Sequence, residues 1–279
     1  MRVSSEMCIT QSDDTDAQED LMRLRTAVVT GASRGIGRQI ALDLARHDIA
    51  VVAVARSRRG NRHGGSAHDT AREIVERGGR AVAVVADVSD PDDADRIIGT
   101  GYGEFGSIDI LVNNAADTSG GTPGLVDLEM SDWLRQFETN LHAPFRLMQS
   151  VVPDMIAAGG GLILNMTSGA GDLERVAEEA VLGGPRLAYS ASKAALNRLS
   201  AAVAVELRPA GIAVISVDPG FTRTELVDRM AVKGIVDASS AVPMSVPADV
   251  VTYLATSGRA MEYSGEIVRA GDFLTLRSS

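Results

Sequence analysis

Apolar residues in this chain occur in short unbroken runs that alternate with longer segments of mixed polarity. The runs predict buried strands, because strands covered on both faces are apolar throughout. In the longer segments apolar residues recur every three or four positions, which is typical of helices packed on one face. Strands are predicted at residues 24–30, 49–55, 80–88, 108–115, 161–168, 212–220 and 265–270, and helices at 36–48, 67–79, 90–106, 130–158, from 189 onward and near 248–257.

This alternation of strands and helices indicates a parallel sheet with helices on both faces. We therefore predict the α/β class: a single doubly wound, Rossmann-type domain with a parallel sheet of about seven strands. Residues 1–22 lie outside the pattern, since they are polar and acidic and lack the apolar core of a signal peptide. We predict a flexible acidic tail there and a folded domain over residues 23–279.

Charge and composition argue against several classes of function. The net charge of −10 disfavours a nucleic-acid surface, and no apolar run is long enough to cross a membrane. The single cysteine, Cys8, cannot form an intrachain disulfide. The four histidines are scattered without the spacing of metal ligands, so no metal site is predicted. We expect a cytoplasmic protein.

A glycine-rich turn, Thr30–Gly37 or "TGASRGIG", joins the first predicted strand to the first predicted helix. Residues without side chains let a pyrophosphate approach the backbone, and the start of a helix supplies amide donors and partial positive charge. The spacing differs from the common G-x-G-x-x-G fingerprint. The position of the turn nevertheless indicates a phosphate-binding loop for a dinucleotide.

A tyrosine and a lysine, Tyr189 and Lys193, stand at the head of an alanine- and leucine-rich helix in the sequence "YSASK". Residues four apart share a helix face. Alone, the pair fits a half-buried tyrosine and a lysine that extends its amine to solvent. The alternative is a catalytic pair, because a nearby cation stabilises a phenolate and lowers the pKa of the phenol.

Several further motifs decide between these interpretations. They follow in order as "ADV" at 86–88, "NNAA" at 113–116, Asn140, Ser168 and "DPGFTRT" at 218–224. With them, the chain from Leu24 to Asp272 resembles the short-chain dehydrogenase/reductases (SDRs). The resemblance implies an SDR catalytic domain that transfers a hydride between nicotinamide and a ketone or secondary alcohol.

The resemblance also assigns roles to the catalytic candidates. Tyr189 is expected to be the general acid in reduction and the base in oxidation, with Lys193 lowering its pKa and binding the nicotinamide ribose. Ser168 would hold the substrate oxygen, although Ser168 or Thr167 could instead cap the turn after the strand. Asn140 would support a water-mediated proton path to the lysine, or simply be a polar residue that interrupts a helix.

The cofactor contacts implied by the family follow the ends of the strands. Asp87 and Val88 would meet the adenine ring, although Asp87 could also cap a turn. Pro219 and Gly220 would shape the turn under the nicotinamide. The other expected contacts, besides Tyr189 and Lys193, are Gly31, Ser33, Arg34, Gly35, Ile36, Gly37, Asn113, Asn114, Ala115, Thr222 and Thr224.

Arginines at the end of the second strand favour NADP(H) over NAD(H). An acidic residue there would bind the adenosine ribose and repel a 2′-phosphate, but Ala55 stands in its place. Arg56 and Ser57 follow directly, and Arg34 comes from the glycine-rich turn. Arg59 and Arg62 fit a solvated basic loop.

Two segments are expected to shape the substrate site. The segment formed by residues 169–188 is longer than is usual in the family. It forms either a lid over the active site or a passive surface loop. Residues 221–246 correspond to the substrate loop, whose apolar residues either cover a moderately hydrophobic substrate or pack a short helix. The end of the chain, "AGDFLTLRSS", also departs from the family pattern, which bears on subunit contacts.

The expected partner is therefore a small-molecule carbonyl or alcohol, with neither nucleic acid nor membrane. A homo-oligomer, tetramer or dimer, is expected from the resemblance. The alternatives are a non-catalytic dinucleotide sensor of the same fold and a protein whose long helices serve chiefly in assembly.

Overall fold

The computed structural model describes residues 24–56, 65–119, 121, 123–173 and 186–273. The predicted tail at 1–22, Ser57, Arg59, Arg62 and the chain end at 274–279 lie outside the described residues. A parallel sheet of seven strands confirms the predicted fold class, with the order β3-β2-β1-β4-β5-β6-β9. Its strands are β1 Thr26–Thr30, β2 Ala50–Ala55, β3 Ala81–Val85, β4 Ile110–Asn113, β5 Gly161–Met166, β6 Ile212–Asp218 and β9 Ile267–Arg269.

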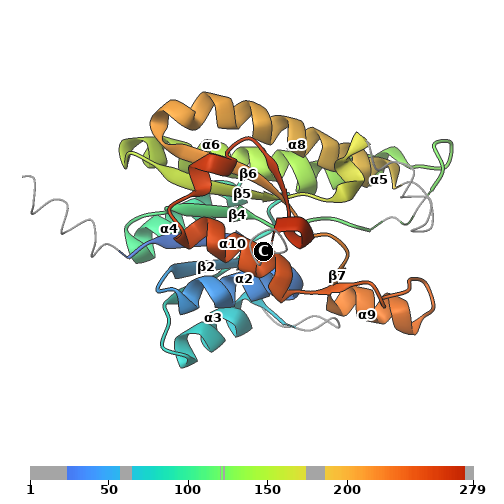
Figure 1. Ribbon diagram of the computed structural model, residues 1–279, viewed down its shortest axis with the longest axis horizontal. Coiled ribbons are helices and arrows are strands. Elements are labelled where there is room, and N and C mark those ends of the chain that lie inside the picture. Colours follow the sequence, from blue (N-terminus) through green and yellow to red (C-terminus); the bar gives the residue numbers. More distant parts are fainter. Residues whose placement is uncertain (1–23, 57–64, 120, 122, 174–185, 274–279) are drawn as a thin grey trace, which may run out of the picture.

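Helices cover both faces of the sheet (Figure 1). One face packs against α2 (Gly35–Arg46), α3 (Ala67–Glu76) and α10 (Ser245–Thr256). The other packs against α4 (Asp93–Phe105), α6 (Ala143–Ala157) and α8 (Leu187–Leu207). This is the doubly wound arrangement expected from the alternation of strands and helices.

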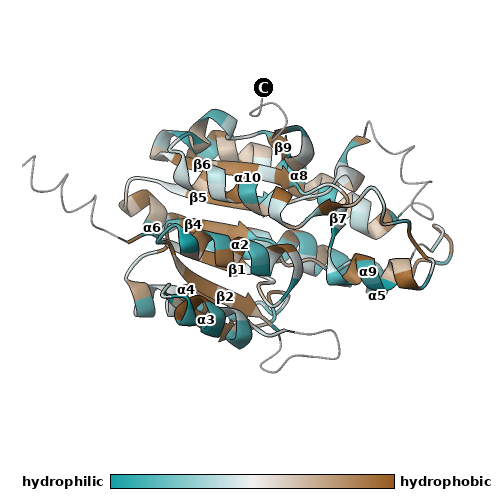
Figure 2. Cartoon of the chain, turned by 60° about the horizontal axis from the view of Figure 1, so that its bottom comes forward, coloured by the Kyte–Doolittle hydropathy of each residue, from teal (hydrophilic) through white to brown (hydrophobic). Residues whose placement is uncertain are grey.

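Alternate residues of each central strand enter opposite cores. In β1, Ala27 and Val29 pack with α2 and α10, whereas Val28 packs with α4 and α6. These side chains are fully buried, and complete burial of a valine stabilises the fold by about 1.5–3 kcal/mol. The strands are accordingly apolar along their lengths, as Figure 2 shows for β1 and β2.

The helical region predicted at 130–158 is interrupted by a π turn. It consists of α5 (Met130–Phe137), a π-helical turn at Glu138–His142, and α6. Asn140 lies within this turn and is fully buried. A π turn holds one more residue than an α turn and is common at functional sites.

The predicted substrate loop forms a small layer of its own beside the main sheet. A short parallel pair, β7 (Thr222–Arg223) and β8 (Val242–Pro243), flanks the helix α9 (Glu225–Val232). None of the α9 residues is buried. Leu226, Val232 and Ile235 are among the exposed large apolar residues, so they do not pack a helix into the core.

Among the described residues, no helix combines the length and the apolar character needed to cross a lipid bilayer.

A buried polar chain ties the centre of the sheet to α8. Asn113 Nδ2 donates to Asn165 Oδ1 at 2.8 Å, and Asn165 Nδ2 donates to Ser200 Oγ at 2.9 Å. Ser200 in turn donates to the Leu196 carbonyl. Burying a polar group is costly unless the group is hydrogen-bonded. Asn165 therefore fixes the positions of β4, β5 and α8 relative to one another.

We predict that Asn165→Ala lowers the free energy of unfolding by about 2–4 kcal/mol, because two buried partners lose their hydrogen bonds and a cavity opens. Urea unfolding followed by circular dichroism measures this. Glu206→Ala changes an exposed position of α8 and should leave the free energy of unfolding within about 0.5 kcal/mol of the parent value. Equal effects of the two substitutions would contradict the role of Asn165.

Candidate functional site

A cleft of about 280 Å³ opens where β1, β2 and β4 end. Strand order reverses between β1 and β4, and ligands of open α/β sheets bind at such a point. The cleft is lined by twelve of the residues predicted from the sequence: Gly31, Ser33, Arg34, Gly35, Ile36, Gly37, Arg56, Asp87, Val88, Asn114, Ala115 and Thr224.

The glycine-rich turn is shaped by close packing against the end of β4. Gly31 has φ +68°, in the left-handed region. A Cβ atom on Gly37 would lie 2.2 Å from Asn114 Nδ2 and 2.6 Å from the Gly31 carbonyl oxygen. Only glycine fits such contacts. The turn therefore brings the start of α2, with its amide donors, to the floor of the cleft.

Thr30 and Asn114 fix the two strand ends that carry the cleft. Thr30 Oγ1 accepts hydrogen bonds from the backbone N–H groups of Asn114 and Ala115, at 2.9 and 3.0 Å. Asn114 Nδ2 donates to the Thr30 carbonyl at 2.8 Å. The amide nitrogen of Asn114 is thus engaged in a structural clamp, while the residue also lines the cleft, where a cofactor contact was expected. The role of Thr30 was not predicted.

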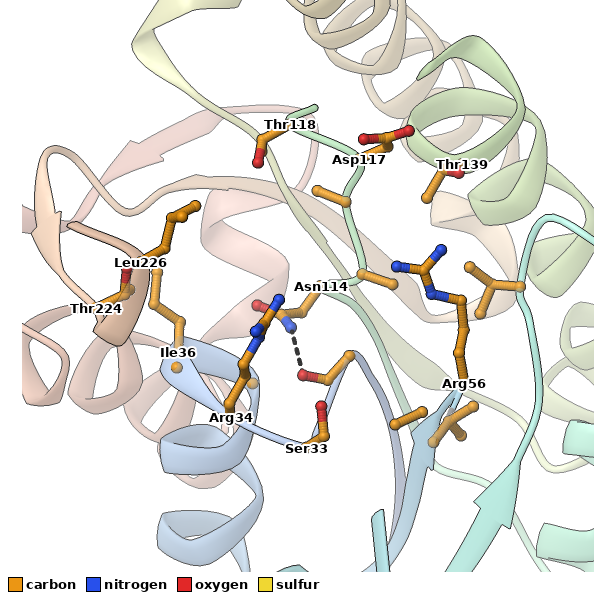
Figure 3. A pocket seen from close by; sticks show the side chains of 18 of the residues that line it. Ser33, Arg34, Ile36, Arg56, Asn114, Asp117, Thr118, Thr139, Thr224 and Leu226 are labelled. Atoms are coloured by element: carbon orange, nitrogen blue, oxygen red, sulfur yellow. Dashed lines mark hydrogen bonds between the residues drawn. The ribbon is translucent and has the colours of Figure 1, made fainter. Parts of the chain in front are cut away.

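Two arginines enter the cleft, Arg34 from the turn before α2 and Arg56 from the end of β2, as Figure 3 shows. Arg34 Nη1 is buried and has no hydrogen-bond partner among the described residues. Arg56 is more exposed, and its Nη1 lies 3.9 Å from Asp87 Oδ2. A buried, unpartnered guanidinium nitrogen in a cleft fits an anionic ligand. Ala55 ends β2 without an acidic group, as the sequence indicated.

Asp87 has a structural role in this arrangement. Its Oδ1 accepts from the backbone N–H and the hydroxyl of Ser89, at 3.0 and 2.7 Å. It therefore caps the turn after β3, the alternative considered from the sequence. Asp87 also lines the cleft, so its position remains compatible with a ligand contact.

The carboxylate of Glu225, which the sequence did not single out, contacts the glycine-rich turn. The Gly35 N–H donates to Glu225 Oε1 at 3.4 Å. Gly35 begins α2, where unpaired amides and the helix dipole attract negative charge. Glu225 begins α9, whose N-cap is Thr224, so the substrate loop contacts the phosphate-binding turn through this carboxylate.

The second group of candidates lies around Tyr189, at the start of α8. Lys193, one turn further, is 2% exposed, and its Nζ donates to the Met166 carbonyl at 2.8 Å. The ammonium nitrogen is 5.8 Å from the centre of the Tyr189 ring. Burial lowers the pKa of Lys193 to about 8.

The Tyr189 phenol is subject to opposing influences. Burial raises its pKa, whereas the charge of Arg186 and a hydrogen bond with the Ser168 side chain lower it, and Asp218 raises it further. Ser168 Oγ also accepts from the Ala170 N–H at 3.2 Å and caps the short 3₁₀ turn Gly169–Gly171. Ser168 is therefore both a cap and a neighbour of the phenol.

Asn140 is hydrogen-bonded to the loop after β4 and to the residue before Lys193. Its Oδ1 accepts from the Asp117 N–H at 2.8 Å, and its Nδ2 donates to the Asp117 carbonyl at 3.0 Å and to Ser192 Oγ at 3.1 Å. Ser192 precedes Lys193 in α8. The π turn thus joins the loop after β4 to the helix that carries Tyr189.

The turn after β6 stands apart from the lining of the cleft. The Gly220 N–H donates to Asp218 Oδ1 at 3.0 Å, and Thr222 Oγ1 donates to the Pro219 carbonyl at 2.9 Å. Of the expected residues in this region, only Thr224 lines the cleft. Ser168, Tyr189, Lys193 and Asn140 are also absent from its lining, so the candidates form two adjacent groups.

An ion pair joins the extended loop after β5 to the last strand of the sheet. Asp172, from the extended loop after β5, pairs with Arg269 at the end of β9. Both side chains are partly buried. Residues 174–185 of the extended loop lie outside the described residues.

Known proteins are similar to this chain in sequence and in fold. The family described as short chain dehydrogenase matches residues 25–233. A 3-oxoacyl-[acyl-carrier-protein] reductase from Synechocystis is 34% identical over 247 residues, 87% of this chain and 93% of its own. The oxidoreductase UcpA from Escherichia coli is 34% identical over 235 residues, 81% of this chain and 82% of its own.

A solved structure gives the same result in three dimensions. A 7α-hydroxysteroid dehydrogenase in complex with NADH and 7-oxo glycochenodeoxycholic acid superposes with a TM-score of 0.75 at 28% identity, covering 90% of this chain and 95% of its own. With a family match over most of the sheet and relatives along nearly the whole chain, this protein belongs to the short-chain dehydrogenases, a family of nicotinamide-dependent oxidoreductases.

Proposed function

We propose that this protein is an NADP(H)-dependent oxidoreductase that interconverts a ketone and a secondary alcohol, with Tyr189 as its general acid and base. One observation carries the proposal: the buried ammonium of Lys193 lies 5.8 Å from the centre of the Tyr189 ring, and the Ser168 side chain neighbours the same phenol. A phenol in this setting can give a proton to a developing alkoxide and recover it afterwards.

Each side chain of the group has a distinct task in the proposed reaction. Bound nicotinamide supplies or accepts the hydride. Tyr189 donates the proton to the substrate oxygen in reduction, and Ser168 holds that oxygen and stabilises its charge. Lys193 is kept in place by the Met166 carbonyl, so its charge is fixed near the phenol rather than free in solvent.

The choice of NADP(H) is supported by the two arginines of the cleft. Arg34 Nη1 is a buried donor without a partner among the described residues, and Arg56 lies at the end of β2, where Ala55 provides no acid. A 2′-phosphate is an acceptor that suits such donors. Arg34 and Arg56 would hold it, while the start of α2 would hold the pyrophosphate.

The relatives and the exposed loop indicate the class of substrate. The names of the Synechocystis reductase and of the steroid enzyme's ligand both refer to oxo compounds. Leu226, Val232 and Ile235 of the substrate loop are exposed, which suits a moderately hydrophobic ketone. The same proposal includes a cytoplasmic location. It also includes a homo-oligomer, tetramer or dimer, which light scattering tests.

We expect NADPH to be consumed in the presence of a suitable ketone, and Tyr189→Phe to lower kcat by at least about 10²-fold, because the acidic proton is lost while the ring remains. The assay follows loss of reduced cofactor over a panel of oxo acids, thioesters, steroids and cyclic ketones. NADPH binding should be retained in the variant. Tight binding without turnover of any ketone would instead favour a dinucleotide sensor.

The arginines should decide which cofactor is used. Arg34→Gln and Arg56→Asp are each expected to raise the KM for NADPH about tenfold or more, because charge-assisted hydrogen bonds to a phosphate are lost. The KM for NADH should change much less. Steady-state kinetics with both cofactors measure this, with Arg198→Gln on α8 as a control for the loss of one charge. Equal changes for NADPH and NADH would remove the argument for a 2′-phosphate site.

Glu225 should oppose cofactor binding, because its carboxylate occupies an amide donor at the start of α2. Glu225→Gln is expected to lower the Kd for NADPH and for NADH alike by about two- to fivefold, since both carry a pyrophosphate. Fluorescence titration measures both constants. Asp228→Asn makes the same charge change on α9 and should leave them unaltered; weaker binding by Glu225→Gln would refute the competition.

A further inference from the structure

Arg186 occupies a position where local rules disfavour an arginine. It is the N-cap residue of α8, and its side chain makes no cap hydrogen bond. Serine, threonine, asparagine and aspartate are preferred at this position, and a cation is repelled by the positive end of the helix. Residues that break local rules often stand at functional sites. The contacts of Arg186 give a reason for its presence.

The guanidinium is fixed from two sides. Its Cζ lies 4.4 Å from the centre of the Tyr189 ring, which is a cation–π contact. Its Nη2 donates to the Thr118 carbonyl at 2.8 Å. Thr118 lies in the loop after β4 and lines the cleft. A planar guanidinium can stack on a ring and donate to a carbonyl at once, which an ammonium cannot do equally well.

Several charged and polar groups around the phenol act on its ionisation in opposite directions. Lys193 is 5.8 Å from the ring centre, and burial lowers its own pKa to about 8. Asp218 at the end of β6 disfavours the phenolate, and the Ser168 hydroxyl favours it. Arg186 favours it as well, and a guanidinium keeps its charge in proteins.

We propose that Arg186 is a positioning residue for Tyr189: a second, permanent cation that holds the ring in place and favours its ionised form. This extends the proposed function and rests on it, since it concerns the same acid and base. Lys193 follows Tyr189 by one turn of α8, and Arg186 precedes Tyr189 by about one turn. The phenol thus keeps a cationic neighbour above the pH at which Lys193 loses its proton.

The proposal predicts the sign of a pH shift. Tyr189 must be ionised to act as a base in oxidation and protonated to act as an acid in reduction. Without the charge of Arg186 the pKa of the phenol rises. The rising limb of the oxidation profile and the falling limb of the reduction profile should therefore both move to higher pH, by about one unit. A merely structural role would lower both rates without moving either limb.

The test begins with a measurement that needs no substrate. Phenolate absorbance is titrated in the parent and in Arg186→Gln, each with and without Tyr189→Phe, so that the difference isolates Tyr189 from the other tyrosines. Glutamine removes the charge and keeps an amide donor on a shorter side chain. We expect about tenfold less Tyr189 phenolate at a given pH in Arg186→Gln. Far-UV circular dichroism defines the pH range in which every variant is folded.

Two further variants make the result specific. Arg186→Lys restores a charge and should return the Tyr189 titration close to that of the parent. Arg198→Gln removes an exposed charge from the same helix and should leave the titration unchanged. An Arg186→Gln titration equal to that of Arg198→Gln overturns the inference even if the protein reduces ketones. A shifted titration in a protein without turnover upholds it and overturns only the proposed function.

Discussion

The burial of the sheet on both faces is the constraint from which the rest of this structure follows. Strands such as β1 and β2 are enclosed between two helical layers, so their inner positions are apolar. Polar groups gather near the ends of the strands, and Asn165 within β5 is kept by two buried hydrogen bonds. Because the strands are parallel, their carboxyl ends share one edge, and chemistry that the strands exclude collects there.

Ionisable side chains are buried at that edge, which costs free energy. Lys193 is buried and donates to the Met166 carbonyl, and Tyr189 is partly buried beside it. Burying an ionisable group disfavours its charged form, which lowers the pKa of a lysine and raises that of a tyrosine. The clamp between Thr30 and Asn114 and the network around Asn140 hold the loops that surround these groups.

The sequence was sufficient for those features that depend on local pattern. Uninterrupted apolar runs such as 49–55 identified the strands, and the spacing of glycines from Gly31 to Gly37 identified the turn that lines the cleft. Features that depend on contacts between distant segments could not be read in this way. Glu225 meets Gly35 across 190 positions, and Arg186 meets Thr118 across 68, so neither was predicted.

The π turn at Glu138–His142 has a consequence for how the chain can vary in evolution. Such a turn accommodates one additional residue while the helices on either side keep their own faces toward the core. Loss of one residue here would convert the region into a continuous α-helix, with α6 still packed and Asn140 withdrawn from Asp117. Alignments with relatives should therefore tolerate a one-residue gap at this turn, and its presence or absence would mark a change in the loop after β4 rather than in the fold.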